Sequence, residues 1–154
     1  MKKIKVLSES PEITKKIASK FAASVVRKSS RNARIVTLKG DLGSGKTTFV
    51  LGFLNFFGIK PHAASPTFVI MKRYKINSKL KTQNSKIKNI YHLDAYRLHS
   101  KKDLGILGFG EIEENPKNIV LIEWPERIKG KTFREKVALA FFYGRKENER
   151  IIRL

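Results

Sequence analysis

The 154-residue sequence predicts an α/β fold, and two observations support this prediction. First, residues 35–38 and 119–122 are short apolar runs without the alternation of polar and apolar residues that marks a half-exposed strand. Runs of this kind are typical of strands buried on both faces, as in a parallel sheet between helices. Second, a glycine-rich loop at 40–45 follows the first run and leads into a segment with an apolar stripe at helical spacing.

Local signals predict the N-terminal elements. A short strand is expected at 4–7, and a helix over about 12–28, because Ser10 suits the N-cap and Pro11 suits the first turn. The apolar face of this helix is predicted at every fourth residue, namely at Ile13, Ile17, Phe21 and Val25. A second helix is expected over 46–58, with an apolar stripe formed by Phe49, Phe53, Leu54 and Phe57.

The remaining elements follow from the same kinds of signal. We expect, in chain order, a loop at 65–67, strands within 68–76 and 86–98, a polar hairpin tip at 77–85, a short helical or irregular piece at 101–112, the buried strand at 119–122, and a terminal hairpin formed by 137–143 and 150–154. No internal repeat or linker-like stretch interrupts the chain. We therefore expect a single domain over residues 1–154.

The chain is strongly basic, with 33 Lys and Arg against 13 Asp and Glu and a formal net charge of +20. Only three acids precede residue 94, and residues 72–88 hold seven bases and no acid. A polyanion such as nucleic acid would suit this surface through counterion release. A general bias toward Lys in the source proteome would produce the same composition, so the charge alone leaves both interpretations open.

Composition excludes several classes of protein. The chain has no cysteine, so disulfides, thiolate zinc sites and cysteine nucleophiles are excluded. It has no apolar run of about 18 residues, so no transmembrane helix is expected. The basic N-terminus also lacks the apolar stretch of a secretory signal. These features predict a cytoplasmic protein.

The strongest functional signal is the string GDLGSGKT at residues 40–47, which matches the phosphate-binding pattern G-x-x-x-x-G-K-[ST] in full. Its glycines allow backbone N–H groups to curl around phosphate oxygens, and the following helix adds its positive N-terminal end. Lys46 would reach the β- and γ-phosphates, the Thr47 hydroxyl would bind Mg²⁺, and Thr48 is placed to touch the α-phosphate. The candidate phosphate-binding residues are therefore Leu42, Gly43, Ser44, Gly45, Lys46, Thr47 and Thr48.

Two carboxylates are candidates for the chemistry that accompanies such a loop. Glu123 follows the apolar run at 119–122, where it could hold Mg²⁺ through a water or polarise the attacking water, or be an ordinary strand-end acid. Asp94 follows the apolar stretch at 90–93, and it could instead cap a helix or pair with Arg97. His92 is ambiguous, because a buried histidine in a core is the more common case.

The phosphate-binding loop occurs in several classes of protein, and other sequence features distinguish between them. The guanine-binding string N-K-x-D and the switch string D-x-x-G of GTPases do not occur, and the length leaves no room for the second domain of a ring-forming motor. A small-molecule or nucleoside kinase stays open, with Arg97 and Arg127 as candidates for a lid. A nucleic-acid-binding module whose nucleotide site has lost its function is a third possibility.

Four strings in order give the chain a resemblance to a known family. They are GDLGSGKTTF at 40–49, SPTF at 65–68, YHLDAYRL at 91–98 and IEWPE at 122–126. With these motifs the chain resembles the TsaE (YjeE) family of bacterial ATPases, which act in making threonylcarbamoyladenosine beside the tRNA anticodon. Two departures are small: Ser44 stands where the family more often has Ala, and Ala95 stands where Leu is frequent.

The resemblance implies a three-layer P-loop NTPase fold with a central, mostly parallel sheet and a C-terminal β-hairpin, and it implies ATP and Mg²⁺ as cofactors. It assigns catalytic roles to Lys46, Asp94 and Glu123, with Thr47 and Glu123 on the metal. Whether Asp94 or Glu123 positions the attacking water stays open. The resemblance also implies a switch-like loop with Ser65 and Thr67, and it sets Thr14 and Trp124 near the nucleotide and Arg145 near the base.

The resemblance further implies partners. The family joins the TsaB and TsaD proteins, and its ATP hydrolysis resets that complex between turnovers without itself transferring the threonylcarbamoyl group. Such an ATPase is expected to be slow alone and to be activated when the partner orders its switch loops. Contact with tRNA would be indirect or through the basic surface.

Overall fold

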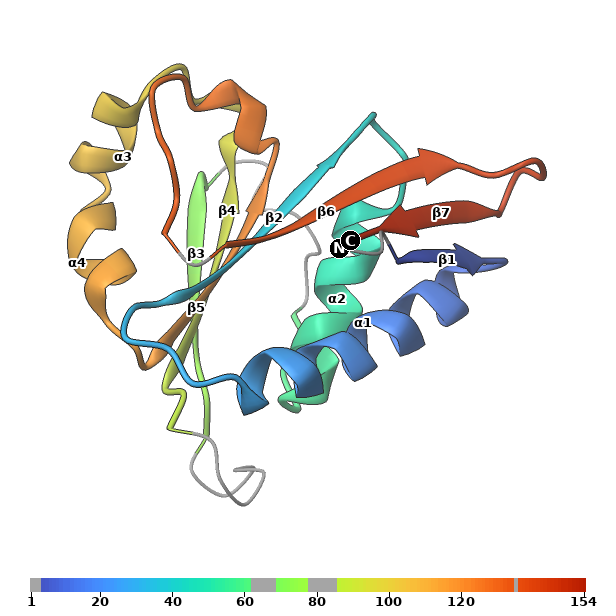
Figure 1. Ribbon diagram of the computed structural model, residues 1–154, viewed down its shortest axis with the longest axis horizontal. Helices are drawn as coiled ribbons and strands as arrows, with labels where there is room; N and C mark the ends of the chain where they lie inside the picture. Colours follow the sequence, from blue (N-terminus) through green and yellow to red (C-terminus); the bar gives the residue numbers. More distant parts are fainter. Residues whose placement is uncertain (1–3, 62–68, 78–85, 135) are drawn as a thin grey trace.

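The computed structural model describes residues 4–61, 69–77, 86–134 and 136–154, and within these it contains a seven-stranded sheet (Figure 1). The strands lie in the order β1-β7-β6-β2-β5-β4-β3. Their bounds are β1 Lys5–Ser8, β2 Arg34–Gly40, β3 Met71–Lys75, β4 Asn89–Asp94, β5 Asn118–Glu123, β6 Lys136–Tyr143 and β7 Arg150–Arg153. The helices are α1 Pro11–Arg27, α2 Lys46–Phe56, α3 Lys101–Ile106 and α4 Phe109–Glu114, with 3₁₀ turns η2 Ala95–Arg97 and η3 Pro125–Arg127.

The direction of the strands confirms the expectation of a mostly parallel sheet. The four central strands β6, β2, β5 and β4 are parallel to one another. The strand β7 is antiparallel to both β6 and β1, so β1 runs in the same direction as the central strands. The edge strand β3 is antiparallel to β4. The strands β6 and β7 form the terminal hairpin predicted from the sequence.

Helices cover both faces of the sheet, which confirms the three-layer architecture (Figure 1). The alternating residues of the central strands divide between two apolar clusters. On β5, Leu121 packs into the cluster that contains α1 and α2, whereas Val120 and Ile122 pack into the cluster that contains α3 and α4. All six residues of β5 are buried. A strand covered on both faces needs apolar residues at successive positions, which explains the lack of alternation in the sequence.

The helix α1 packs closely on α2. The Ser10 hydroxyl accepts a hydrogen bond from the Ile13 N–H at 3.2 Å, so Ser10 is the N-cap as predicted. The predicted apolar face is confirmed only in part, because Ile17 and Phe21 are half-buried at the side of the core. The fully buried positions of α1 are Thr14, Ala18, Ala22 and Val25. Their mostly small side chains let the two helices approach, and a Cβ added at Gly52 of α2 would lie 2.4 Å from Lys15 Cα.

The fold gathers several chain segments at one edge of the sheet. The carboxyl ends of the parallel strands β2, β4 and β5 lie at the same edge, and α2 begins there directly after β2. In α/β sheets this edge is where ligands bind. The predicted loop at 65–67 and hairpin tip at 77–85 fall largely or wholly outside the described residues. None of the described helices combines the length and the apolar character that a membrane-spanning helix needs.

Candidate functional site

The loop between β2 and α2 has the backbone geometry that its glycines predict. Gly43 and Gly45 have φ values of 73° and 98°, in the left-handed region that favours glycine. At Gly40, an added Cβ would lie 2.7 Å from the Phe141 carbonyl oxygen of β6, so the loop begins in close contact with the neighbouring strand. Gly45 is the N-cap of α2, and no side chain caps this helix end. An uncapped helix N-terminus offers its N–H groups to an anion.

Lys46 lies at the start of α2 and is only 4% exposed. Its Nζ donates hydrogen bonds to the carbonyl oxygens of Gly40 at 2.7 Å and Asp41 at 2.8 Å. It also lies 4.1 Å from the centroid of the Trp124 ring. Burial lowers the pKa of Lys46 from its ordinary value, and nearby carboxylates, Glu123 first among them, partly oppose this effect. The ammonium group is therefore held by carbonyls that phosphate oxygens could replace.

Trp124 has an unusual backbone conformation next to Lys46. Its φ is 57°, and it is the one non-glycine residue with positive φ in the part of the chain that the structure describes. Its N–H donates to the Leu38 carbonyl at 3.2 Å, which ties the turn after β5 to β2. Its ring also packs edge-on against Tyr96, at 5.2 Å between ring centroids. A strained residue of this kind is characteristic of functional sites.

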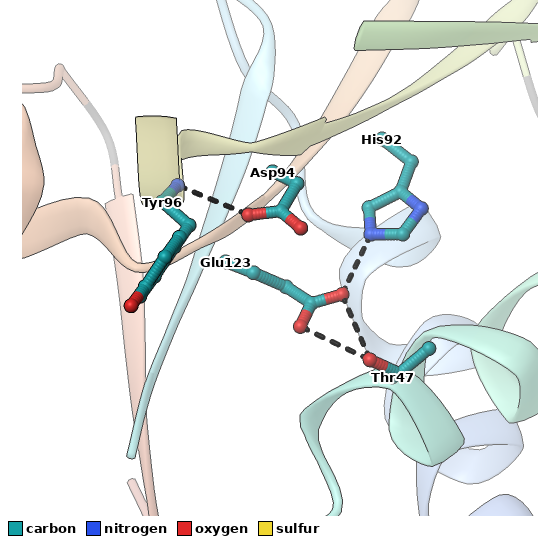
Figure 2. Close-up of polar contacts among 5 residues, drawn as sticks. All are labelled: Thr47, His92, Asp94, Tyr96 and Glu123. Atoms are coloured by element: carbon teal, nitrogen blue, oxygen red, sulfur yellow. Dashed lines mark hydrogen bonds and ion pairs between the residues drawn. The ribbon is translucent and has the colours of Figure 1, made fainter. Parts of the chain in front are cut away.

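Thr47, Glu123 and His92 form a connected polar group (Figure 2). Glu123 ends β5 and is 3% exposed. The Thr47 hydroxyl lies 3.3 Å from Glu123 Oε1 and 3.2 Å from Oε2, so it can donate to either oxygen. On the other side, His92 Nε2 lies 2.8 Å from Glu123 Oε1. A hydroxyl and a carboxylate, both oxygen ligands, thus meet at the start of α2.

Asp94 lies beside Glu123. The two residues are register partners on the parallel strands β4 and β5, and both line the same cavity. Asp94 Oδ1 accepts a hydrogen bond from the Tyr96 N–H at 3.0 Å, which caps the 3₁₀ turn η2 (Figure 2). Asp94 therefore has the capping role considered from the sequence, and it is also placed at the cavity.

The cavity at this edge of the sheet has a volume of about 230 Å³. Most of the residues that the sequence predicted for the site line it: Thr14, Leu42, Gly43, Gly45, Lys46, Thr47, Thr48, Asp94, Glu123 and Trp124. Pro11, Asn148 and Arg150 also line it, although no sequence signal assigned them to the site. Thr14 comes from the first turns of α1, where its hydroxyl lies 2.7 Å from that of Ser8.

Two of the predicted site residues that the structure describes, Ser44 and Arg145, do not line the cavity. Ser44 is 1% exposed behind the loop, and its Oγ has no hydrogen-bond partner among the described residues. Arg145 lies between β6 and β7, where its N–H donates to Glu149 Oε2 at 3.0 Å, and its position near the base stays a prediction. Ser65 and Thr67 lie outside the described residues.

The terminal hairpin contributes contacts that the sequence analysis missed. The Tyr143 hydroxyl donates to the Leu42 carbonyl, and Arg150 Nε donates to the Gly43 carbonyl at 3.2 Å. Tyr143 and Arg150 are register partners on β6 and β7, and the Arg150 guanidinium stacks on the Tyr143 ring. The hairpin therefore holds the glycine-rich loop from one side. These contacts could not be predicted from the motifs, because they depend on the pairing of β6 with β2, which no local pattern in the sequence indicates.

The residues present fit a Mg²⁺ ion bound together with phosphate. Within the described residues there is no group of three or more His, Cys, Asp or Glu side chains that could hold a metal by themselves. Mg²⁺ is usually held by one or two protein oxygens together with substrate phosphates and water. Thr47 and Glu123 provide such oxygens beside an uncapped helix N-terminus.

The buried strand, glycine-rich loop and helix, with Lys46 and Thr47 at the helix start and Glu123 on the neighbouring parallel strand, define a P-loop protein of the α/β class. The family model "Threonylcarbamoyl adenosine biosynthesis protein TsaE" matches residues 8–152. The chain therefore belongs to the TsaE family, whose role lies in the biosynthesis of threonylcarbamoyladenosine in tRNA.

Individual proteins agree with this assignment. The chain is 34% identical to the Bacillus subtilis tRNA threonylcarbamoyladenosine biosynthesis protein TsaE over 140 residues, which cover 90% of this chain and 77% of the relative. It is 35% identical to the Haemophilus influenzae protein of the same name over 75% of this chain and 66% of the relative. The crystal structure of Bacillus subtilis YdiB matches with a TM-score of 0.71 and 30% identity, over 99% of this chain and 84% of that one.

Proposed function

We propose that this chain is a Mg²⁺-dependent ATPase of a single domain that supports threonylcarbamoyladenosine formation in tRNA. The observation that carries the proposal is the meeting of Lys46, Thr47 and Glu123 at one cavity, with the Thr47 hydroxyl within 3.3 Å of both Glu123 oxygens. A cation, a hydroxyl and a carboxylate are the groups that phosphoryl transfer needs beside a phosphate-binding loop.

The residues would divide the chemistry as follows. The N–H groups at the start of α2 and the ammonium of Lys46 bind phosphate oxygens, and Thr47 and Glu123 hold the metal side. Bound Mg²⁺ would neutralise charge on the phosphates. Glu123 is hydrogen-bonded to Thr47 and His92 and is assigned to the metal. We therefore assign the orientation of the attacking water to Asp94, its register partner on β4. Thr14 and Trp124 would contact the nucleotide at the cavity wall.

We further propose that the chain acts in the cytoplasm with TsaB and TsaD, and that its ATP hydrolysis resets their complex between turnovers. Alone it would hydrolyse ATP slowly, and its partner proteins would activate it. Contact with tRNA would be indirect or through the exposed bases on and near β3, including Lys72, Arg73 and Lys75.

Reconstitution tests this proposal. The chain would be mixed with TsaB, TsaD and tRNA, and both ATP hydrolysis and modified tRNA would be measured. We expect hydrolysis to rise when the partners are present, and we expect Lys46→Ala to abolish both signals. ATP turnover that rises only with a small phosphate acceptor would favour a kinase instead. Full tRNA modification by the Lys46→Ala chain would show that nucleotide turnover is not its function.

A further inference from the structure

His92 is a buried histidine in direct contact with the candidate metal carboxylate. It lies in the middle of β4 with its side chain fully buried, on the same face of the sheet as Asp94. Its Nε2 reaches across to the neighbouring strand and lies 2.8 Å from Glu123 Oε1 (Figure 2). The residue two positions earlier on this strand, Ile90, packs into the apolar core. An apolar side chain at position 92 would continue that packing. The packing alone therefore does not explain why a histidine stands here.

The surroundings of the second ring nitrogen, Nδ1, indicate which nitrogen of His92 carries the proton. Nδ1 is buried and has no hydrogen-bond partner among the described residues. A proton on Nδ1 would leave a buried donor without an acceptor, which is costly, whereas an unused lone pair costs less. The hydrogen-bond network therefore assigns the proton to Nε2, where it is donated to Glu123. The single polar function of this side chain is to hold one carboxylate oxygen.

The two contacts of Glu123 differ in what they can do when the site is loaded. The Thr47 hydroxyl donates to Glu123 here, but it must turn its oxygen toward the metal if Thr47 is to serve as a ligand. The His92 contact comes from the opposite side, from within the sheet, and needs no rearrangement. His92 is thus the contact that can keep Glu123 in place in both states.

We propose that His92 is a positioning residue that orients Glu123 for Mg²⁺ through its Nε2–H group. The inference rests on the proposed function, since it assigns to His92 a role toward the metal of that same site. Hydrogen-bonded partners of metal ligands fix the direction of the ligand, and their loss typically weakens metal affinity by about 10–100-fold.

Two amide variants separate positioning from packing. In His92→Gln the terminal amide can reach the position of Nε2, whereas in His92→Asn the shorter side chain places its amide near the position of Nδ1, out of reach of Glu123. Both variants bury the same kind of polar group, so their effects on folding should be similar. His92→Leu, which has no donor, is a third variant that avoids a buried amide.

The measurement uses Trp124, the single tryptophan of the chain, which lines the cavity beside Lys46. Its fluorescence would be titrated with ADP, first without metal and then with increasing Mg²⁺, and the midpoint of thermal unfolding would be recorded for each variant. We expect all variants to bind ADP alone like the unaltered chain. We expect the apparent Mg²⁺ affinity to fall by about tenfold in His92→Asn and His92→Leu, and to be largely kept in His92→Gln.

The outcomes are distinguishable. Equal Mg²⁺ affinity in all three variants and the unaltered chain would overturn the positioning role and leave the proposed function standing. An equal loss of affinity in His92→Gln and His92→Asn would do the same. An unaltered chain whose nucleotide binding does not depend on Mg²⁺ would overturn the proposed function and the inference with it. A loss of Mg²⁺ affinity confined to His92→Asn and His92→Leu supports the inference, provided that His92→Gln and His92→Asn unfold at similar temperatures.

Discussion

The close approach of α1 and α2 makes Gly52→Ala a sharp test of the structure. An added Cβ would lie 2.4 Å from Lys15 Cα and 2.5 Å from its carbonyl oxygen. Ordinary contact begins near 3.4 Å, so α1 would have to move by roughly 1 Å or the side chains between the helices would have to repack. Overpacking of this kind costs about 1–3 kcal/mol.

The matched control is Gly105→Ala in α3. Gly105 is exposed, and nothing lies within 4 Å of a Cβ added there. Both substitutions give a helix the better propensity of alanine, worth about 0.5–1 kcal/mol. We therefore expect Gly105→Ala to be neutral or stabilising and Gly52→Ala to be destabilising. Because the propensity gain is common to both variants, the gap between them would be the overpacking cost of about 1–3 kcal/mol, or roughly 2–12 °C in the unfolding midpoint for a chain of this size.

Urea unfolding and thermal unfolding of both variants would measure this gap. The same variants also report on the site, because Thr14 of α1 and Thr48 of α2 line one cavity. A shift of α1 should weaken nucleotide binding in Gly52→Ala and leave it unchanged in Gly105→Ala. Gly52→Ala that is as stable as Gly105→Ala would refute the reasoning, because it would mean that the two helices do not meet at this residue.

Three further predictions concern the site. Glu123→Ala should lower ATP hydrolysis by more than the roughly 10–100-fold that loss of a hydrogen-bonded partner of a metal ligand causes, and it should affect ADP binding less. An equal loss of both would indicate a structural role. Burial lowers the pKa of Lys46, so the unfolded chain holds more protons than the folded one at alkaline pH. The stability of the unaltered chain relative to Lys46→Met, measured in urea, should therefore rise as the pH approaches 10.5, the ordinary pKa of lysine, from below, and a constant difference would contradict this. Tyr143→Phe should speed amide exchange in the loop at 41–45 while leaving α1 unchanged, since it removes a bond worth about 0.5–1.5 kcal/mol.

Local patterns in the sequence were sufficient for the fold class and for the centre of the site. The buried strands β2 and β5 are read from apolar runs, and Lys46, Thr47 and Glu123 each stand at a fixed position relative to such a run. In a parallel sheet the strand ends meet at one edge, so residues that end neighbouring strands converge. This rule brings Asp94 and Glu123 together without any knowledge of the side chains.

Other features of the site depend on pairings that no local pattern contains. The contact between His92 and Glu123 requires that β4 lie beside β5 in a particular register. The contacts of Tyr143 and Arg150 require that β6 lie beside β2, and the same hairpin geometry brings Arg150 to the cavity. The buried face of α1 also differs from the predicted one. Close packing on Gly52 favours small residues at the contact over the larger apolar residues that the sequence pattern indicated.

The position of β2 in the sheet has a consequence for how the protein forms. Residues 34–40 are made early, but they pair with β5 and β6, which are made much later. The contact between Leu42 and Tyr143 spans 101 residues of sequence, and that between Gly43 and Arg150 spans 107. Contacts of such length are slow to form. A growing chain would therefore carry the phosphate-binding motif long before it could bind a nucleotide, and competence would arise only after the last strands had been synthesised.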